Sequence, residues 1–194
     1  GFMSAHVRTE NLKVYFQARS GLFRSTDVKA VDGVSISIER GKTLALVGES
    51  GSGKTTLGRA LLHLLEPKDG KILFGDREMG HLRRREAKEF RRRAQAIFQD
   101  PYSSISPYMT VQEIVEEPLV IHRIGSRSER LDAVLEAIET VKLSPADEIV
   151  GKYAHNLSGG QRQRVSIARA MILEPEFVVA DEPVSMVDAS NRAE

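Results

Sequence analysis

Hydrophobic and polar positions follow two different patterns along the chain. Short alternating or apolar stretches, typical of strands, occur before residue 100 and again near the end. These stretches predict strands at residues 12–16, 28–38, 71–74, 95–98 and 177–180, the last of them buried. Between residues 107 and 172 the apolar positions recur at helical spacing instead. A helical segment inserted between strands predicts an α/β protein.

Three helix starts within the helical segment can be predicted from capping boxes, in which a Ser or Thr and a Glu or Gln three residues later satisfy each other's backbone N–H groups. They are Thr110-x-x-Glu113, Ser126-x-x-Glu129 and Ser158-x-x-Gln161. We expect Pro118 to kink or divide the first of these helices, because proline lacks the N–H that continues the hydrogen-bond ladder.

A basic stretch at residues 81–93, HLRRREAKEFRRR, carries seven positive and two negative side chains. Such a run could contact a phosphate backbone. Its apolar residues are too few to bury much surface, so we interpret it as a solvated surface helix or loop.

Composition narrows the possible functions. The 194 residues are 41% hydrophobic, which is enough for one domain with an inserted lobe. No apolar run approaches the roughly 18 residues of a membrane span, and no secretory leader opens the chain, so a membrane role would require a partner. The absence of cysteine excludes disulfides and thiolate chemistry. Lys+Arg 28 nearly balances Asp+Glu 27, so global charge does not favour nucleic acid.

A phosphate-binding loop is the strongest motif, and it lies within residues 43–65. The apolar run Leu44–Val47 predicts a strand, glycines follow, and Leu57, Leu61, Leu64 and Leu65 then recur at helical spacing. In the frame Gly48-x-x-x-x-Gly53-Lys54-Thr55, backbone N–H groups would surround phosphates at a helix N-terminus. Lys54 would reach the β- and γ-phosphates, and the Thr55 hydroxyl would bind Mg²⁺. The residues predicted to bind the phosphates of a nucleotide are Gly48, Glu49, Ser50, Gly51, Ser52, Gly53, Lys54, Thr55 and Thr56.

A second anion site is predicted where a helix begins with two glycines. Each glycine costs a helix about 1 kcal/mol relative to alanine, so their presence in the first turn calls for a reason. Uncovered N–H groups beside a Ser hydroxyl suit a γ-phosphate. The residues concerned are Leu157, Ser158, Gly159, Gly160 and Gln161.

Two adjacent carboxylates end the last predicted strand, at the edge where open parallel sheets bind ligands. Asp181 would hold Mg²⁺, and Glu182 would orient and deprotonate the water that attacks the γ-phosphate.

An aromatic residue is expected to stack on adenine. Phe23 is the aromatic residue in the polar loop 17–27 and is one candidate. It could equally pack on a sheet edge, and Tyr15 or Phe16 could serve in its place.

The order of these motifs resembles the ATP-binding-cassette ATPases. Residues 48–56 match Walker A, Gln99 the Q-loop, residues 157–161 the LSGGQ signature and residues 181–182 Walker B. The D-loop match is Ser185 to Asp188, with Met186 and Val187 in place of the usual Ala-Leu. Ahead of the signature, Ala154 and Asn156 replace the usual Pro and Glu. More narrowly, FQDPYSSISPYMTVQEIVEEPL and YAHNLSGGQRQRVSIARAMILEPEFVVADEPVS resemble the ATPase subunits of oligopeptide and dipeptide importers.

The resemblance implies a fold. We expect a P-loop NTPase (RecA-like) core with an N-terminal antiparallel β subdomain of about residues 1–40 and an inserted α-helical subdomain of about residues 107–172. Residues 1–194 would form a single ABC ATPase domain. The C-terminal part of the core would be missing, because the family's switch histidine lies on a further strand beyond Walker B.

The resemblance also implies a function: hydrolysis of ATP, with Mg²⁺, to energise peptide import. Glu182 and Gln99 would be catalytic, and Thr55, Gln99 and Asp181 would bind the metal. ATPase subunits would pair head to tail as a homo- or heterodimer, with the signature of one facing the ATP of the other and Ser185 and Asp188 at the D-loop. The expected partners are transmembrane permease subunits and, indirectly, an extracytoplasmic solute-binding protein, with no nucleic acid. The expected location is the cytoplasmic face of the plasma membrane.

Two other functions are considered. A non-transport ATPase of this superfamily acting on DNA or the ribosome is disfavoured by the short spacing of 104 positions between Lys54 and Ser158. A nucleotide-binding regulatory module without turnover is disfavoured by Glu182.

Overall fold

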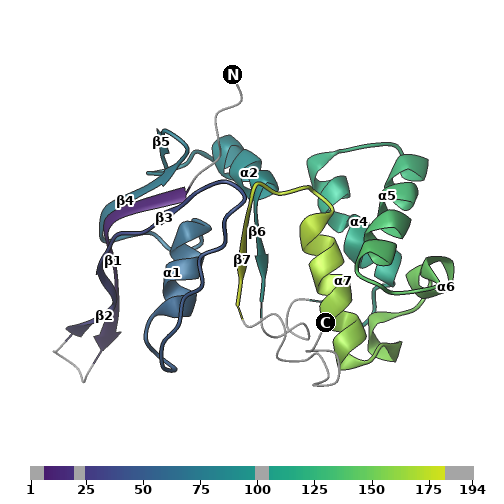
Figure 1. Ribbon diagram of the computed structural model, residues 1–194, viewed down its shortest axis with the longest axis horizontal. Coiled ribbons are helices and arrows are strands. Elements are labelled where there is room, and N and C mark those ends of the chain that lie inside the picture. Colours follow the sequence, from purple (N-terminus) through teal and green to yellow (C-terminus); the bar gives the residue numbers. More distant parts are fainter. Residues whose placement is uncertain (1–6, 20–24, 99–104, 182–194) are drawn as a thin grey trace. The chain divides into compact units, whose positions relative to one another are not determined.

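The computed structural model describes residues 7–19, 25–98 and 105–181. The chain divides into two compact units, Gly1–Arg91 and Arg92–Glu194 (Figure 1). Each unit contains its own sheet, antiparallel in the first and parallel in the second. The mixed α/β prediction is therefore confirmed, and each unit is described by itself below.

The first unit is built on an antiparallel sheet, as expected for the N-terminal part of the chain. Its strands follow the order β2-β1-β4-β5, and β3 also pairs with β1. The predicted strands 12–16 and 71–74 lie within longer ones, and the 28–38 stretch is divided between two. The bounds are β1 (Val7–Arg19), β2 (Ser25–Val34), β3 (Ser37–Ile38), β4 (Asp69–Phe74) and β5 (Arg77–Glu78).

The two faces of this sheet differ in character. Leu12, Val14 and Val31 are at most 4% exposed, and helix α1 (Lys54–Leu61) packs against β1 and β2. Leu57 and Leu61 form the buried side of α1. The other face is polar and carries Lys13 and Tyr15 of β1 with Lys29 and Asp32 of β2. Two register shifts in the β1–β2 pairing interrupt the alternation of β2.

The apolar run Leu44–Val47 is not a strand, and that prediction is wrong. Leu44 is 43% exposed, Leu46 41% and Val47 95%. Apolar composition favours a strand only where a neighbouring strand supplies hydrogen bonds, and within the described residues none is paired with this run.

Helix α1 is shorter than the leucine spacing predicts. It ends at Leu61, since His63 adopts a left-handed backbone conformation with φ 55, and Leu64 is 49% exposed. The basic stretch forms helix α2 (Arg84–Arg93), which confirms the interpretation as a solvated helix. Its buried residue, Phe90, packs edge-on against Phe74 with ring centroids 5.4 Å apart.

The second unit contains two parallel strands, β6 (Ala94–Ile97) and β7 (Phe177–Ala180). Both strands were predicted, but β7 is not fully buried. Its first three residues are half-buried and Ala180 is exposed. A strand in the centre of a sheet has neighbours on both sides, and among the described residues β7 pairs with β6 alone.

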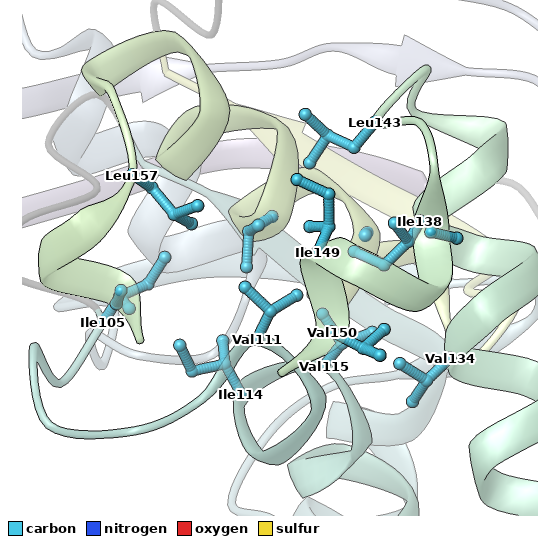
Figure 2. Close-up of a cluster of buried hydrophobic side chains, with 14 residues drawn as sticks. Ile105, Val111, Ile114, Val115, Val134, Ile138, Leu143, Ile149, Val150 and Leu157 are labelled. Carbon is cyan, nitrogen blue, oxygen red and sulfur yellow. The ribbon is translucent and has the colours of Figure 1, made fainter. Parts of the chain in front are cut away.

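Helices make up the rest of the second unit and share one apolar core (Figure 2). All three predicted capping boxes are present, at Thr110, Ser126 and Ser158. Pro118 is buried within an unbroken α4, so the expected division of that helix is wrong. The bounds are α4 (Val111–His122), α5 (Arg127–Thr140), α6 (Ala146–Val150), the short 3₁₀ helix η1 (Ala154–Asn156) and α7 (Gly159–Met171).

Candidate nucleotide-binding site

The loop Gly48–Gly53 leads directly into α1, and its last glycine is required by two independent features. Gly53 has φ 90, a conformation that side chains disfavour. A Cβ at this position would lie 2.1 Å from the carbonyl oxygen of Ala30, closer than any real contact. The loop therefore rests on β2 at a place where only glycine fits. Sequence reasoning missed Ala30, and nothing in the motif points to it.

Lys54 lies over the loop that precedes it. Its ammonium donates to the carbonyl oxygens of Gly48 and Glu49, at 2.8 and 2.7 Å, and lies 3.4 Å from the Ser52 hydroxyl. The Ser52 N–H also donates to Glu49 O at 3.2 Å, which closes the turn. The cation is thus held among the loop carbonyls, where a ligand's phosphates would meet it.

The start of α1 favours an anion. Gly53 is the N-cap residue and provides no side-chain cap, so the helix N-terminus carries its partial positive charge without a side-chain acceptor from that position. Thr55 is exposed and Thr56 half-buried in the first turn. Glycine-lined backbone, a helix N-terminus and a lysine together can bind phosphate groups.

The signature segment forms the start of α7. Ser158 is exposed, and its hydroxyl accepts from Gln161 N at 3.2 Å while the Gln161 side chain accepts from Ser158 N at 2.9 Å. Leu157 is 4% exposed and belongs to the helical core, so it anchors the segment. Gly159 and Gly160 follow as half-buried backbone in the first turn.

One departure from the family pattern has a structural consequence. The Ala154 N–H donates to Met109 O at 3.0 Å, a bond that the usual proline could not form. Nearby, the His155 ring donates from Nδ1 to Pro107 O, 2.8 Å away, and stacks on Tyr153. These contacts tie the segment before the signature to the segment before α4.

Asp181 directly follows β7. Its N–H donates to Ile97 O at 2.9 Å, which continues the parallel ladder, and the residue is half-buried. Since β6 and β7 are parallel, their carboxyl ends lie at the same edge of the sheet. Asp181 thus occupies the edge at which open sheets bind ligands.

The predicted residues divide between the two units. The phosphate-binding loop belongs to the first unit, and the signature and Asp181 belong to the second. Five predicted residues lie outside the described part of the chain: Phe23, Gln99, Glu182, Ser185 and Asp188.

The structure distinguishes between the two remaining aromatic candidates. Val31 lies beside Gly53 and is opposite Val14, so Val14 points to the face of the loop and α1. The pairing shifts by one residue between Val14 and Tyr15, but the extra residue, Ala30, lies in β2, so β1 keeps its alternation and Phe16 shares the face of Val14. Phe16 is 42% exposed. Tyr15 points to the other face.

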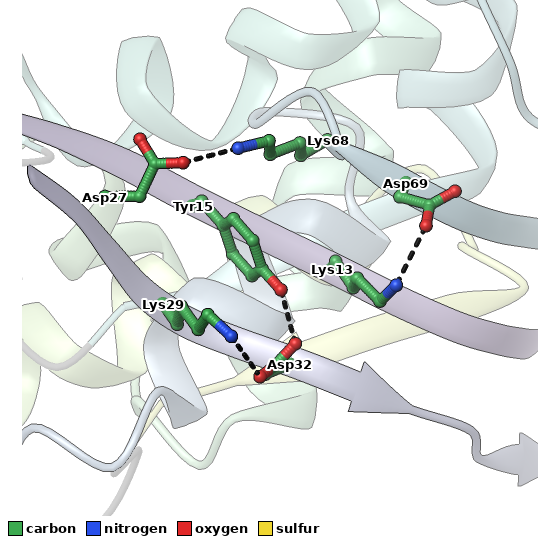
Figure 3. A network of polar contacts seen from close by, with 7 residues as sticks. All are labelled: Lys13, Tyr15, Asp27, Lys29, Asp32, Lys68 and Asp69. Carbon is green, nitrogen blue, oxygen red and sulfur yellow. Dashed lines mark hydrogen bonds and ion pairs between the residues drawn. The ribbon is translucent and has the colours of Figure 1, made fainter.

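Tyr15 is engaged in a polar network on that other face (Figure 3). Its hydroxyl donates to the Asp32 carboxylate, which raises the pKa of Tyr15 and lowers the pKa of Asp32. Lys29 and Lys68 lie over the ring, at 5.5 and 4.8 Å from its centroid. Tyr15 is therefore already part of a surface cluster.

A glycine-lined loop that enters a helix at a lysine defines a phosphate-binding-loop, nucleotide-binding class of protein. A capped SGG helix start and a carboxylate after a parallel strand accompany it here. The chain belongs to the ABC transporter family, whose model matches residues 31–185.

Comparison with known proteins supports this assignment. A putative peptide import ATP-binding protein of Brucella ovis is 52% identical over 188 residues, 97% of this chain and 59% of that protein. The oligopeptide transport ATP-binding protein AppF of Bacillus subtilis is 46% identical over 97% of this chain and 57% of its own length. The chain thus spans less than two thirds of the length of these curated relatives.

Solved structures show the same fold. The ATP-binding cassette MJ0796, in a dimeric post-hydrolysis state bound to ADP and Pi, is 28% identical and has a TM-score of 0.83. The match covers 95% of this chain and 77% of that one. This similarity confirms the expected cassette fold. Among the described residues, no helix is long and apolar enough to cross a membrane.

Proposed function

We propose that this chain binds ATP with Mg²⁺ and hydrolyses it as the ATP-binding part of a peptide import system. The observation that carries the proposal is the loop itself, in which Gly53 packs on Ala30 and Lys54 lies among the loop carbonyls. The names of the relatives, which are peptide and oligopeptide transport ATP-binding proteins, support the transport role.

Each residue has a defined task in this proposal. Lys54 and the N–H groups of the loop bind the β- and γ-phosphates and orient them. Thr55, Asp181 and Gln99 would supply oxygen ligands to the metal, and Mg²⁺ prefers oxygen ligands. The metal would neutralise phosphate charge. Glu182 orients the attacking water and accepts its proton.

The signature would act on a neighbouring subunit's nucleotide. The exposed Ser158 and the half-buried first turn of α7 form a donor surface at a helix N-terminus, suited to a γ-phosphate. The structural relatives are dimeric cassettes, which supports a head-to-tail homo- or heterodimer, with Ser185 and Asp188 at the D-loop.

Phe16 is our proposed adenine contact. It is an exposed aromatic residue on the sheet face that carries the phosphate-binding loop. It lies two residues beyond Val14 on β1, which is about 7 Å along the strand. Phe23, the first candidate from sequence, lies outside the described residues and stays a prediction.

The wider assembly follows from the transport role. We place the chain at the cytoplasmic face of the plasma membrane, bound to transmembrane permease subunits and indirectly served by an extracytoplasmic solute-binding protein. The two units would belong to one cassette domain, with a β subdomain of about residues 1–40 and a helical subdomain of about 107–172. None of the relatives named above is described as acting on DNA or the ribosome.

Hydrolysis is tested by Glu182→Gln. The amide keeps the shape of the side chain and removes the base, so ATP should still bind while the rate of phosphate release falls. Asp147→Asn, an exposed carboxylate on α6, is the matched control and should hydrolyse ATP like the parent. An unchanged rate in Glu182→Gln would refute its role as base.

A further inference from the structure

A basic stripe runs along the outward side of α2. Arg85, Lys88 and Arg92 stand at helical spacings of three and four residues, so they share one face of the helix. All three are exposed, and the buried Phe90 lies on the opposite side. The stripe spans the eight residues from Arg85 to Arg92, and seven helical rises between them give a length of about 10 Å.

Neighbouring residues strengthen the positive charge of this face. Arg84 and Arg91 are also exposed and flank the stripe. Glu86 is turned toward Arg77 and the Arg83 N–H, and the bond from that N–H is the main reason that the pKa of Glu86 is lowered. Glu89 is the remaining acid among the exposed residues of the helix.

The composition of the stripe argues against an ordinary protein interface. The exposed residues of α2 are all charged, whereas protein interfaces have an apolar core in which lysine and glutamate are depleted. Phe90, the one large apolar residue of α2, is 5% exposed and packs on Phe74. A purely electrostatic surface of this kind fits a surface of anionic phosphate groups.

We propose that the outward face of α2 binds the anionic headgroups of phospholipids. The whole chain is nearly neutral, with a net charge of +1, so the positive charge is concentrated on this helix and would orient the molecule. The choice of lipid rather than nucleic acid rests on the proposed function, which places the chain beside a membrane.

The test compares two triple variants of the chain by co-sedimentation with vesicles. The first is Arg84→Gln, Arg85→Gln and Arg92→Gln, which removes three cations from the face. The second is Arg40→Gln, Arg127→Gln and Lys152→Gln, which removes three exposed cations elsewhere. Vesicles of phosphatidylcholine with and without phosphatidylglycerol are used, at low and at high salt.

We expect the parent chain to bind the vesicles that contain phosphatidylglycerol and to be released by salt. The α2 variant should bind about 100-fold more weakly, the change expected for three cations near a charged surface, and the control variant should bind like the parent.

The proposal would be overturned if the parent bound vesicles with phosphatidylglycerol no better than vesicles of phosphatidylcholine alone. It would also be overturned if both variants lost vesicle binding equally. Stronger binding to duplex DNA than to the anionic vesicles would also overturn it, in favour of a nucleic-acid surface. Calorimetric titration of the α2 variant with MgATP accompanies the assay. If the α2 variant binds MgATP with the affinity of the parent, the lipid proposal and the proposed ATP binding are tested separately, and a negative vesicle result would leave the proposed function intact.

Discussion

The glycines of the phosphate-binding loop are required for different structural reasons, although the motif does not distinguish between them. Gly51 and Gly53 both have positive φ values, 81 and 90. A Cβ at Gly51 would meet open space, whereas one at Gly53 would overlap the Ala30 carbonyl. Backbone freedom is therefore the reason for Gly51, and close approach to β2 is the added reason for Gly53.

We predict that Gly53→Ala weakens ATP binding far more than Gly51→Ala. A left-handed alanine costs about 1–2 kcal/mol at either site, but only at Gly53 must the loop also move away from β2. Titration calorimetry should show about a 5- to 30-fold loss of affinity at most for Gly51→Ala and a larger loss for Gly53→Ala. Equal losses would mean that the contact with Ala30 is unimportant.

A second prediction concerns the base of the nucleotide. Stacking of a base on an aromatic side chain is worth about 1–3 kcal/mol by alanine substitution, so Phe16→Ala should weaken ATP binding by about 5- to 150-fold. Tyr15→Ala is the matched control on the opposite face of β1 and should bind ATP like the parent. The reverse order of the two affinities would contradict the assignment of Phe16.

At the scale of helices and strands, the capping signals predicted helix starts well, whereas apolar pattern alone did not always predict a strand. Ser or Thr with Glu or Gln three residues later predicted the starts of α4, α5 and α7, because a capping box is closed by residues next to one another in sequence. Leu44–Val47 had an equally clear apolar pattern and was predicted wrongly. A strand depends on a partner that is distant in sequence, and local pattern carries no information about whether one is present.

The capping box of α4 gives a prediction about stability. Thr110→Ala removes the acceptor for Glu113 N and should lower the free energy of unfolding by about 1 kcal/mol. Chemical denaturation followed by circular dichroism measures this change. Thr140→Ala is the control, because its hydroxyl bonds a carbonyl within its own helix and caps no helix N-terminus.

The same box predicts a dependence on pH. The Thr110 N–H donates to the Glu113 carboxylate and is the main reason that the pKa of Glu113 lies below its ordinary 4.5. The Thr110 hydroxyl bonds the same carboxylate and lowers this pKa further. Because the folded pKa is depressed, this stabilisation is fully present above pH 4.5 and is lost as pH falls through the folded value. The parent should therefore lose stability on acidification more steeply than Glu113→Gln. Parallel curves would show that the charge of Glu113 contributes nothing.

At the scale of the whole molecule, the family and fold were predictable because the motifs are short, specific and ordered along the chain. The sequence could not choose between the candidate adenine contacts, since Tyr15, Phe16 and Phe23 are all aromatic residues of the same part of the chain. The choice between Tyr15 and Phe16 needed the direction of each side chain, which follows from the pairing of β1 with β2. The role of Ala30 likewise needed a contact between segments 23 positions apart in sequence.

The central claim is that the chain binds MgATP through the phosphate-binding loop, and calorimetric titration of Lys54→Ala tests it most directly. Lys54 faces several phosphate charges in the proposed complex, and a charge-assisted bond is worth about 1.5–3 kcal/mol. The variant should bind MgATP roughly 10- to 150-fold more weakly than the parent, while Lys42→Ala, an exposed lysine before the loop, should leave the affinity unchanged. Equal affinity of Lys54→Ala and the parent would contradict the account.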